Sequence, residues 1–190
     1  MPELSIFYVR QGAKTFLACS WGPKGCCTLV PKQIGTIGGL TVKELRSEIE
    51  IEAPTERVWG VLTDFAAYPE WNPFIRRVSG RAEVSERLVV RMQPSGTRGM
   101  TFRPTVMKVE PGRELRWLGH LLVPGIFDGE HIFEIEELER DRVRFVQREV
   151  FKGLLVPLLA RSLDRDTQRG FEEMNRALRE RIELSDQNAD

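Results

Sequence analysis

Histidine and cysteine are scarce in this chain, which has two histidines and three cysteines among its 190 residues. Cys19, Cys26 and Cys27 cluster near the N-terminus without Cys-x-x-Cys spacing, so they indicate neither a disulfide framework nor a zinc site. Because His120 and His131 are the only histidines, a histidine-rich metal centre is excluded. We therefore expect no metal and no cofactor, and take the reducing cytoplasm as the default location.

An excess of charge of one sign is also lacking, since 28 basic side chains balance 28 acidic ones. Nucleic-acid binders usually carry a basic excess, and membrane-surface proteins carry one on a single face. No stretch approaches the roughly 20 apolar residues that cross a bilayer. We expect neither a nucleic-acid partner nor stable membrane insertion, and the oligomeric state is left open. Phosphate-loop, nucleophile-elbow and dinucleotide-binding glycine motifs are missing as well.

Residues 1–42 differ in composition from the rest of the chain. They are rich in glycine and carry Arg10, Lys14, Lys24 and Lys32 against the single acid Glu3. Their apolar runs are too short for a secretory signal, whereas an organelle transit peptide stays open as an alternative. We expect residues 1–42 to be a poorly ordered extension or the result of a misassigned start, 43–184 to form one domain, and 185–190 to be a disordered tail.

From residue 42 onward, hydrophobic periodicity becomes regular. Alternation over 48–52 predicts a strand, and helical spacing of Val58, Trp59, Leu62 and Phe65 predicts a helix that ends before Pro73, with room for a second short turn. Six further strands are predicted at 75–84, 87–93, 100–109, 114–120, 127–138 and 142–150. A helical stripe from 157 to 184 predicts one long C-terminal helix. This order is typical of an α+β layer arrangement in which an antiparallel sheet packs on a helix.

Several motifs resemble the SRPBCC superfamily of START and birch-pollen-allergen-like helix-grip proteins, and most closely its polyketide cyclase/dehydrase-like type. They are Glu-Ala-Pro-x-Glu-x-Val-Trp at 52–59, Asp-Phe-x-x-Tyr-Pro-Glu-Trp-Asn-Pro-Phe at 64–74, Gly-Glu-His-x-Phe at 129–133 and Phe-x-x-Arg-Glu-x-Phe-x-Gly-Leu at 145–154. The resemblance covers about 42–184. It implies a curved antiparallel sheet of about seven strands around the long helix, with two short helices after the first strand. It also implies a largely apolar cavity between sheet and helix.

Strand alternation predicts which polar side chains face that cavity. His131 and Phe133 share one face of their strand, and Gln147 and Glu149 share one face of the next strand. A three-residue loop at 139–141 would set His131 opposite Glu149, whereas a five-residue loop would set it opposite Gln147 and a bulge would spoil the register. Such a pair would orient a ligand oxygen, act as acid and base, or merely satisfy itself in the core.

The remaining candidate ligand-binding residues are large apolar side chains on predicted inner faces or at the helix-to-strand break. With His131, Phe133, Gln147 and Glu149, the predicted set comprises Trp71, Phe74, Met92, Phe102, Trp117, Phe145, Phe171 and Met174. Each has core packing as its alternative role. The apolar turn at 121–126 is a candidate cavity flap or contact surface.

The resemblance implies a protein that binds a small hydrophobic ligand, such as a lipid, quinone or polyketide-like molecule, in an internal cavity. One alternative is an enzyme of the cyclase/dehydratase kind that uses His131 and Glu149, and another is a co-chaperone-like interaction module. The sequence does not decide whether the chain is an enzyme, although it favours a binding protein.

Overall fold

The computed structural model describes residues 33–37, 40–121 and 123–187. A hairpin of β1 (Gln33–Ile37) and β2 (Leu40–Ile51) is followed by α1 (Thr55–Thr63), a 3₁₀ turn (Phe65–Ala67) and α2 (Tyr68–Trp71). The strands that follow are β3 (Ile75–Ser79), β4 (Val89–Met92), β5 (Met100–Phe102), β6 (Thr105–Glu110), β7 (Glu114–Leu121), β8 (Phe127–Glu139) and β9 (Arg142–Lys152). The chain closes with α3 (Val156–Ser162), a π-helix (Leu163–Thr167) and α4 (Gln168–Gln187).

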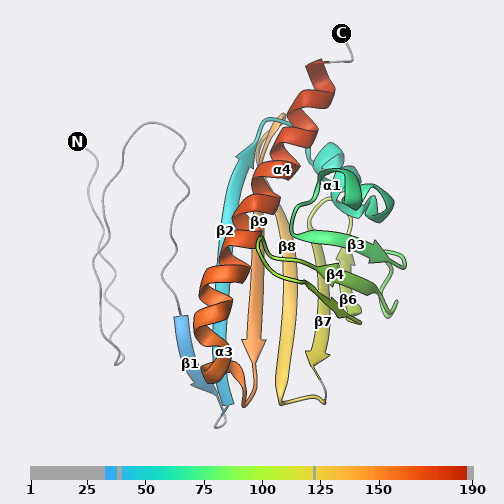
Figure 1. Cartoon of the computed structure of the whole chain (residues 1–190). Coiled ribbons are helices and arrows are strands. Elements are labelled where there is room, and N and C mark those ends of the chain that lie inside the picture. The colour runs from blue at the N-terminus through green and yellow to red at the C-terminus, as the bar shows by residue number, and fades with distance from the viewer. Residues whose placement is uncertain (1–32, 38–39, 122, 188–190) are drawn as a thin grey trace, which may run out of the picture.

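The strands form two antiparallel sheets, one of six strands in the order β1-β2-β9-β8-β7-β6 and one of three in the order β3-β4-β5. Figure 1 shows α4 running along one face of the larger sheet, with α1 and the smaller sheet on the same side. Helix α4 packs on β2 and β9, and α1 contacts both α4 and β8. The predicted helix-grip fold, with two short helices after an early strand, is confirmed.

Several element boundaries differ from those that the sequence predicts. The strand predicted at 48–52 extends over Leu40–Ile51, the one predicted at 75–84 ends at Ser79, and the one predicted at 87–93 is limited to Val89–Met92. The strand predicted at 100–109 is divided at Pro104, which has no N–H to donate, and there the chain passes from the smaller sheet to the larger one. Strand β1 lies inside the segment assigned to the N-terminal extension and pairs with β2 over its whole length. Residues 40–42 of that extension begin β2, and residues 1–32 and 38–39 lie outside the described residues. A further difference is in the C-terminal helix.

The π-helix explains how one apolar stripe stays aimed at the sheet. Leu159, Leu163, Thr167 and Phe171 advance by four residues at each step. Four residues of α-helix turn about 400°, so each step overshoots by about 40° and three steps by about 120°. A π turn accommodates one extra residue, worth about 100°, and so cancels most of the drift. The predicted long helix is therefore helical throughout but carries this irregular turn at Leu163–Thr167.

The face of the large sheet away from α4 carries a charged ladder, in which arginines on β7 and β9 pair with glutamates on the same strand or on neighbouring strands. Its ion pairs are Arg116 with Glu114 and Glu130, Arg148 with Glu134 and Glu44, and Arg144 with Glu136 and Glu50. The opposite face is apolar and forms the core with α1, α2 and α4. Strand alternation thus separates a charged outer face from a buried inner face.

Candidate functional site

Strand register builds the inner face of the large sheet in rows that cross β7, β8, β9 and β2. One row consists of Trp117, His131, Glu149 and Leu45, so the predicted opposition of His131 and Glu149 is confirmed. The hairpin reaches this register in an unexpected way. A two-residue turn pairs Glu139 with Arg142, and a bulge between Glu137 and Glu139 then restores the register of a three-residue loop. The bulge compensates for the short turn rather than spoiling the register.

The neighbouring row opens a space because two of its members have no side chain. It consists of Gly119, Gly129, Phe151 and Lys43. The two glycines lie side by side on β7 and β8, and both line a pocket of about 360 Å³. This volume is near the lower end of the range for sites that bind drug-sized ligands. The pocket therefore occupies the α3 end of the groove between sheet and helix, directly over the glycine row.

The pocket wall is predominantly apolar. On the strands and directly beside them, the lining residues are Phe74, Met92, Met100, Phe102, Pro104, Trp117, Gly119, His120, Leu121, Phe127, Gly129, Glu149 and Phe151. The β4–β5 loop contributes Pro94, Thr97, Arg98 and Gly99, and the helical segment contributes Leu159, Ser162, Leu163, Asp166 and Thr167. The polar residues of the loop and helix are exposed or half-buried. The polar side chains that the loop and the helical segment contribute to the pocket therefore lie where these segments meet solvent.

Two polar contacts fasten the segments around the pocket to the rest of the fold. Ser95, at the tip of the β4–β5 loop, donates a hydrogen bond to Glu173 of α4 at 2.5 Å. Lys43 of β2 is fully buried and forms an ion pair with Asp164 of the π-helix. A buried lysine requires such a partner because removal of its charge from water is costly. The pair thus anchors the irregular helical turn to the sheet.

Glu149 is a buried carboxyl on the pocket wall, with 8% of its surface exposed. Its Oε2 lies 3.6 Å from His131 Nδ1. Its Oε1 lies above Gly129, where an added Cβ would approach it to 2.9 Å. Burial raises the pKa of Glu149 from about 4.5 to about 8, because the charged form loses its solvation. At neutral pH the protonated form of the carboxyl therefore predominates, and this form is able to donate a hydrogen bond.

His131 lies behind Glu149 and does not line the pocket. Gln147 Nε2 lies 3.0 Å from His131 Nε2 and 3.3 Å from Met174 Sδ, and donates to both. With Nε2 as acceptor, the proton of the neutral imidazole is on Nδ1, facing Glu149. Burial lowers the pKa of His131 to about 3, so the ring is uncharged at neutral pH. The pair is therefore two neutral groups, of which one reaches the pocket.

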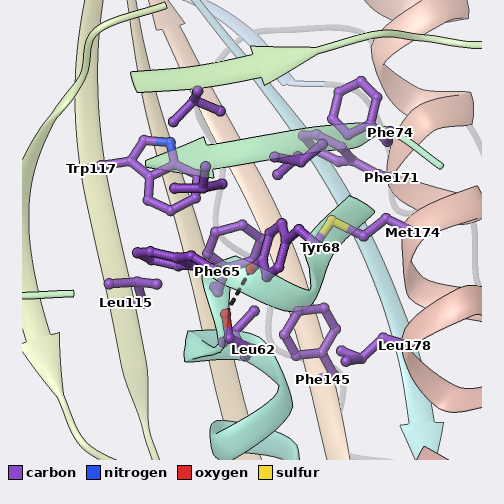
Figure 2. Packing of buried hydrophobic residues seen from close by; sticks show 14 of the residues in the cluster. Leu62, Phe65, Tyr68, Phe74, Leu115, Trp117, Phe145, Phe171, Met174 and Leu178 are labelled. Atoms are coloured by element: carbon purple, nitrogen blue, oxygen red, sulfur yellow. Dashed lines mark hydrogen bonds between the residues drawn. The ribbon is translucent and has the colours of Figure 1, made fainter. Parts of the chain in front are cut away.

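A layer of rings separates the pocket from the core. Trp117 contacts His131 at 5.4 Å between centroids, His131 contacts Phe171 at 5.1 Å, and Phe171 contacts Phe74 at 5.8 Å. The Phe74 ring lies so close to α4 that a Cβ at Gly170 would be 2.2 Å from it. Figure 2 shows Trp117 on one side and Phe74 with Phe171 on the other, and beneath them the packed side chains of the core. Beyond this layer, core side chains fill the groove between the large sheet and α4.

The structure brings five of the twelve predicted residues to the pocket and places seven elsewhere. Those that line the pocket are Phe74, Met92, Phe102, Trp117 and Glu149. His131 and Phe171 belong to the ring layer, and Phe133, Phe145, Gln147 and Met174 are buried in the core beyond it. Trp71 packs half-buried against Tyr68. Alternation identified their inward direction correctly, but large neighbouring rings fill the space that they face. Their contact with a ligand stays a prediction.

Sequence reasoning missed the glycine row and the loop and helical residues around the pocket. Gly119 and Gly129 could have been found, because the same register that pairs His131 with Glu149 aligns them. Leu159 and Leu163 belong to the predicted helical stripe. The β4–β5 loop carries no comparable pattern. Of the apolar turn, Leu121 lines the pocket and Val123 is exposed, while residue 122 lies outside the described residues.

Within the described ranges, no three or more His, Cys, Asp or Glu side chains gather in a way that could hold a metal ion. No helix within the same ranges has the length and apolar character needed to span a bilayer.

Comparison with known proteins places the chain among START-like folds. A family model described as polyketide cyclase / dehydrase and lipid transport matches residues 43–183. No curated protein sequence matches significantly. The Zhui aromatase/cyclase from Streptomyces sp. R1128 is similar with a TM-score of 0.62 and 18% identity, over 75% of this chain and 94% of that one.

Two other similar structures are a START superfamily protein and a norcoclaurine synthase. The START superfamily protein from Mycobacterium smegmatis has a TM-score of 0.59 and 22% identity, over 75% of this chain and 98% of that one. Norcoclaurine synthase from Thalictrum flavum has a TM-score of 0.60 and 11% identity, over 83% of this chain and 99% of that one. At these identities the likeness establishes the fold alone.

Proposed function

The chain belongs to the polyketide cyclase / dehydrase and lipid transport family of the SRPBCC superfamily, and from this premise we propose that it binds a small hydrophobic molecule in the pocket over the glycine row. The ligand is a lipid, quinone or polyketide-like molecule. Affinity comes from burial of its apolar surface, and Glu149 orients it from the wall. The observation that carries the proposal is the pocket itself, about 360 Å³ of space with a mostly apolar lining.

The cyclase/dehydratase alternative is less well supported by the geometry. It requires His131 and Glu149 to act together on a ligand, yet His131 does not line the pocket. Burial also lowers the pKa of His131 to about 3, which makes the imidazole a weak proton acceptor at neutral pH. Glu149 alone supplies an acid but no partner base. These facts favour binding over catalysis.

The first test is to identify what the protein carries after gentle purification. Native mass spectrometry should show a bound mass, and organic extraction should release an apolar molecule that can be identified. Incubation of that molecule with the protein then separates the two functions, because a carrier returns it unchanged whereas an enzyme yields a product. Conversion of the molecule to a product would reverse the preference stated above.

A second test fills the pocket. Gly119→Leu adds a side chain over the glycine row, where even the Cβ has an ordinary contact of 3.6 Å with Pro104. Gly60→Leu is the matched control, because Gly60 lies exposed on α1 with no atom within 4 Å of an added Cβ. With the neutral apolar dye N-phenyl-1-naphthylamine as probe, fluorescence titration should show at least ten-fold weaker binding for Gly119→Leu and no change for Gly60→Leu. Equal binding by both variants would place the dye, and the site, elsewhere.

A further inference from the structure

The pocket ends at a single buried polar group. Along β9, Phe151 lines the pocket, Glu149 lines it at the ring layer, and Gln147 lies in the core beyond. On β8, Gly129 lines the pocket whereas His131 is behind the wall. A molecule that enters past the β4–β5 loop and the helical segment therefore meets apolar surface first. The Glu149 carboxyl lies at its inner end.

The surroundings of Glu149 leave its proton available to a ligand. His131 on β8 faces Oε2 with Nδ1, which carries the imidazole proton because Nε2 accepts from Gln147. An N–H group cannot accept the carboxyl proton. On β2, Lys43 is two residues from Leu45, the residue opposite Glu149, but its ammonium is paired with Asp164. At the solvent-exposed mouth of the pocket, the lining also includes Arg98 of the β4–β5 loop and Asp166 of the π-helix.

The glycine at position 129 is what allows the carboxyl to take this place. The backbone of Gly129 lies beneath Oε1, and any larger residue would bring its Cβ to 2.9 Å from that oxygen. The carboxyl thus lies over a bare strand at the pocket boundary. A carboxylic acid that an apolar site keeps neutral is an effective hydrogen-bond donor to a carbonyl oxygen.

We propose that the pocket selects uncharged apolar molecules that carry a carbonyl oxygen at their leading end, and that the Glu149 carboxyl donates a hydrogen bond to this oxygen. The inference rests on the proposed function and adds the chemical class of its ligand. A hydrocarbon of the same shape fills the pocket but leaves the donor unpaired. A hydrogen bond between neutral groups is worth an affinity ratio of about 2- to 10-fold.

The experiment compares two ligands of nearly equal shape, 2-acetylnaphthalene and 2-isopropylnaphthalene, as competitors of N-phenyl-1-naphthylamine. Wild-type protein at pH 6.5 should prefer the ketone about 2- to 10-fold after correction for water solubility. Glu149→Gln retains a neutral donor and should keep the preference, whereas Glu149→Leu should abolish it. Glu136→Gln, which removes a carboxyl on the exposed outer face, is the matched control. The infrared carbonyl stretch of bound ketone should lie at lower frequency in wild type than in Glu149→Leu.

The pH dependence gives an independent readout. Because burial sets the pKa of Glu149 at about 8, the ketone preference should disappear above that pH as the donor loses its proton. In Glu149→Gln it should persist.

The outcomes distinguish this inference from the proposed function. If neither naphthalene displaces the dye because no variant binds it, both fail together. If both naphthalenes bind wild type equally and the carbonyl stretch is unshifted, the pocket binds ligands but the inference is overturned. A ketone preference that survives in Glu149→Leu would assign the donor to another residue and would equally overturn it. Binding of 2-isopropylnaphthalene by Glu149→Leu serves as the check that this variant is folded.

Discussion

Replacement of Gly170 by alanine should destabilise the protein, although the same change in most helices is favourable. Gly170 lies buried in the helical interior where α4 follows the π-helix. An added Cβ would be 2.2 Å from Cδ2 and 2.5 Å from Cε2 of Phe74. Real Cβ atoms do not approach other heavy atoms this closely, so the ring must move. Phe74 is 1% exposed and packs edge-to-face on Phe171 at 5.8 Å, which leaves it little room.

Two opposing terms set the magnitude of this effect. Alanine is favoured over glycine in a helix interior by about 1 kcal/mol. Overpacking of a filled core costs about 1–3 kcal/mol. We expect a net loss of about 1 kcal/mol in the free energy of unfolding for Gly170→Ala. Gly60→Ala, on the exposed side of α1 with no atom near its Cβ, should instead gain up to about 1 kcal/mol. The two substitutions should therefore have opposite signs.

Equilibrium denaturation in urea measures both changes, and a double-mutant cycle with Phe74→Ala assigns the cause. Once the ring is removed, Gly170→Ala should become stabilising by about 1 kcal/mol, which gives a coupling of about 2 kcal/mol between the two positions. Stabilisation by Gly170→Ala in the wild-type background, or a coupling near zero, would refute the reasoning. Since Phe74 also lines the pocket, Gly170→Ala should change the affinity for N-phenyl-1-naphthylamine, which Gly60→Ala should leave unaltered.

Two further predictions concern buried charge. Lys43→Met, which leaves Asp164 without its lysine, should lower the free energy of unfolding by about 2–4 kcal/mol in urea titrations. The double variant Lys43→Met/Asp164→Leu should recover most of this loss. Equal loss in both variants would contradict the prediction. The pair of His131 and Glu149 should give a stability plateau between about pH 4.5 and 6.5. The pKa of Glu149 is raised to about 8, so its contribution to the free energy of unfolding falls as the pH rises from 4.5 to 8. The pKa of His131 is lowered to about 3, so its contribution to the free energy of unfolding falls as the pH decreases from 6.5 to 3. Where the ranges overlap the two slopes cancel, and thermal melts of Glu149→Gln should lack the decline above pH 6.5.

The alternation of side chains along the strands, together with the number of residues in the connecting loop, was sufficient to predict how β8 pairs with β9. The predicted inward side chains of β8 and β9 lie on the inner face, and His131 is opposite Glu149 as expected. The route differed, since a two-residue turn and a bulge together replace the three-residue loop. The side chains keep the same faces and partners because the turn is one residue shorter than expected and the bulge adds one residue to β8. Local pattern therefore predicts pairing even where it misplaces the irregularity.

The location of the pocket could not be predicted in the same way. Whether an inward side chain meets space or another ring depends on volumes from distant segments. His131 is behind the wall because Trp117 of β7 and Phe171 of α4 pack on it. The irregular turn of the long helix was, by contrast, encoded locally, since the spacing of four from Leu159 to Phe171 exceeds the α-helical period. A count of the accumulated angle would have predicted it.

The charged ladder on the outer face of the large sheet bears on how other molecules approach this protein. Each arginine in it forms ion pairs with two glutamates, and the chain as a whole has as many basic as acidic side chains. Opposite charges a few ångströms apart cancel at longer range, and salt screens what remains within about 10 Å. A charged body arriving from a distance therefore feels almost no field from this face, and its encounters are neither accelerated nor oriented by long-range steering. Productive collisions depend on random diffusion to the pocket mouth.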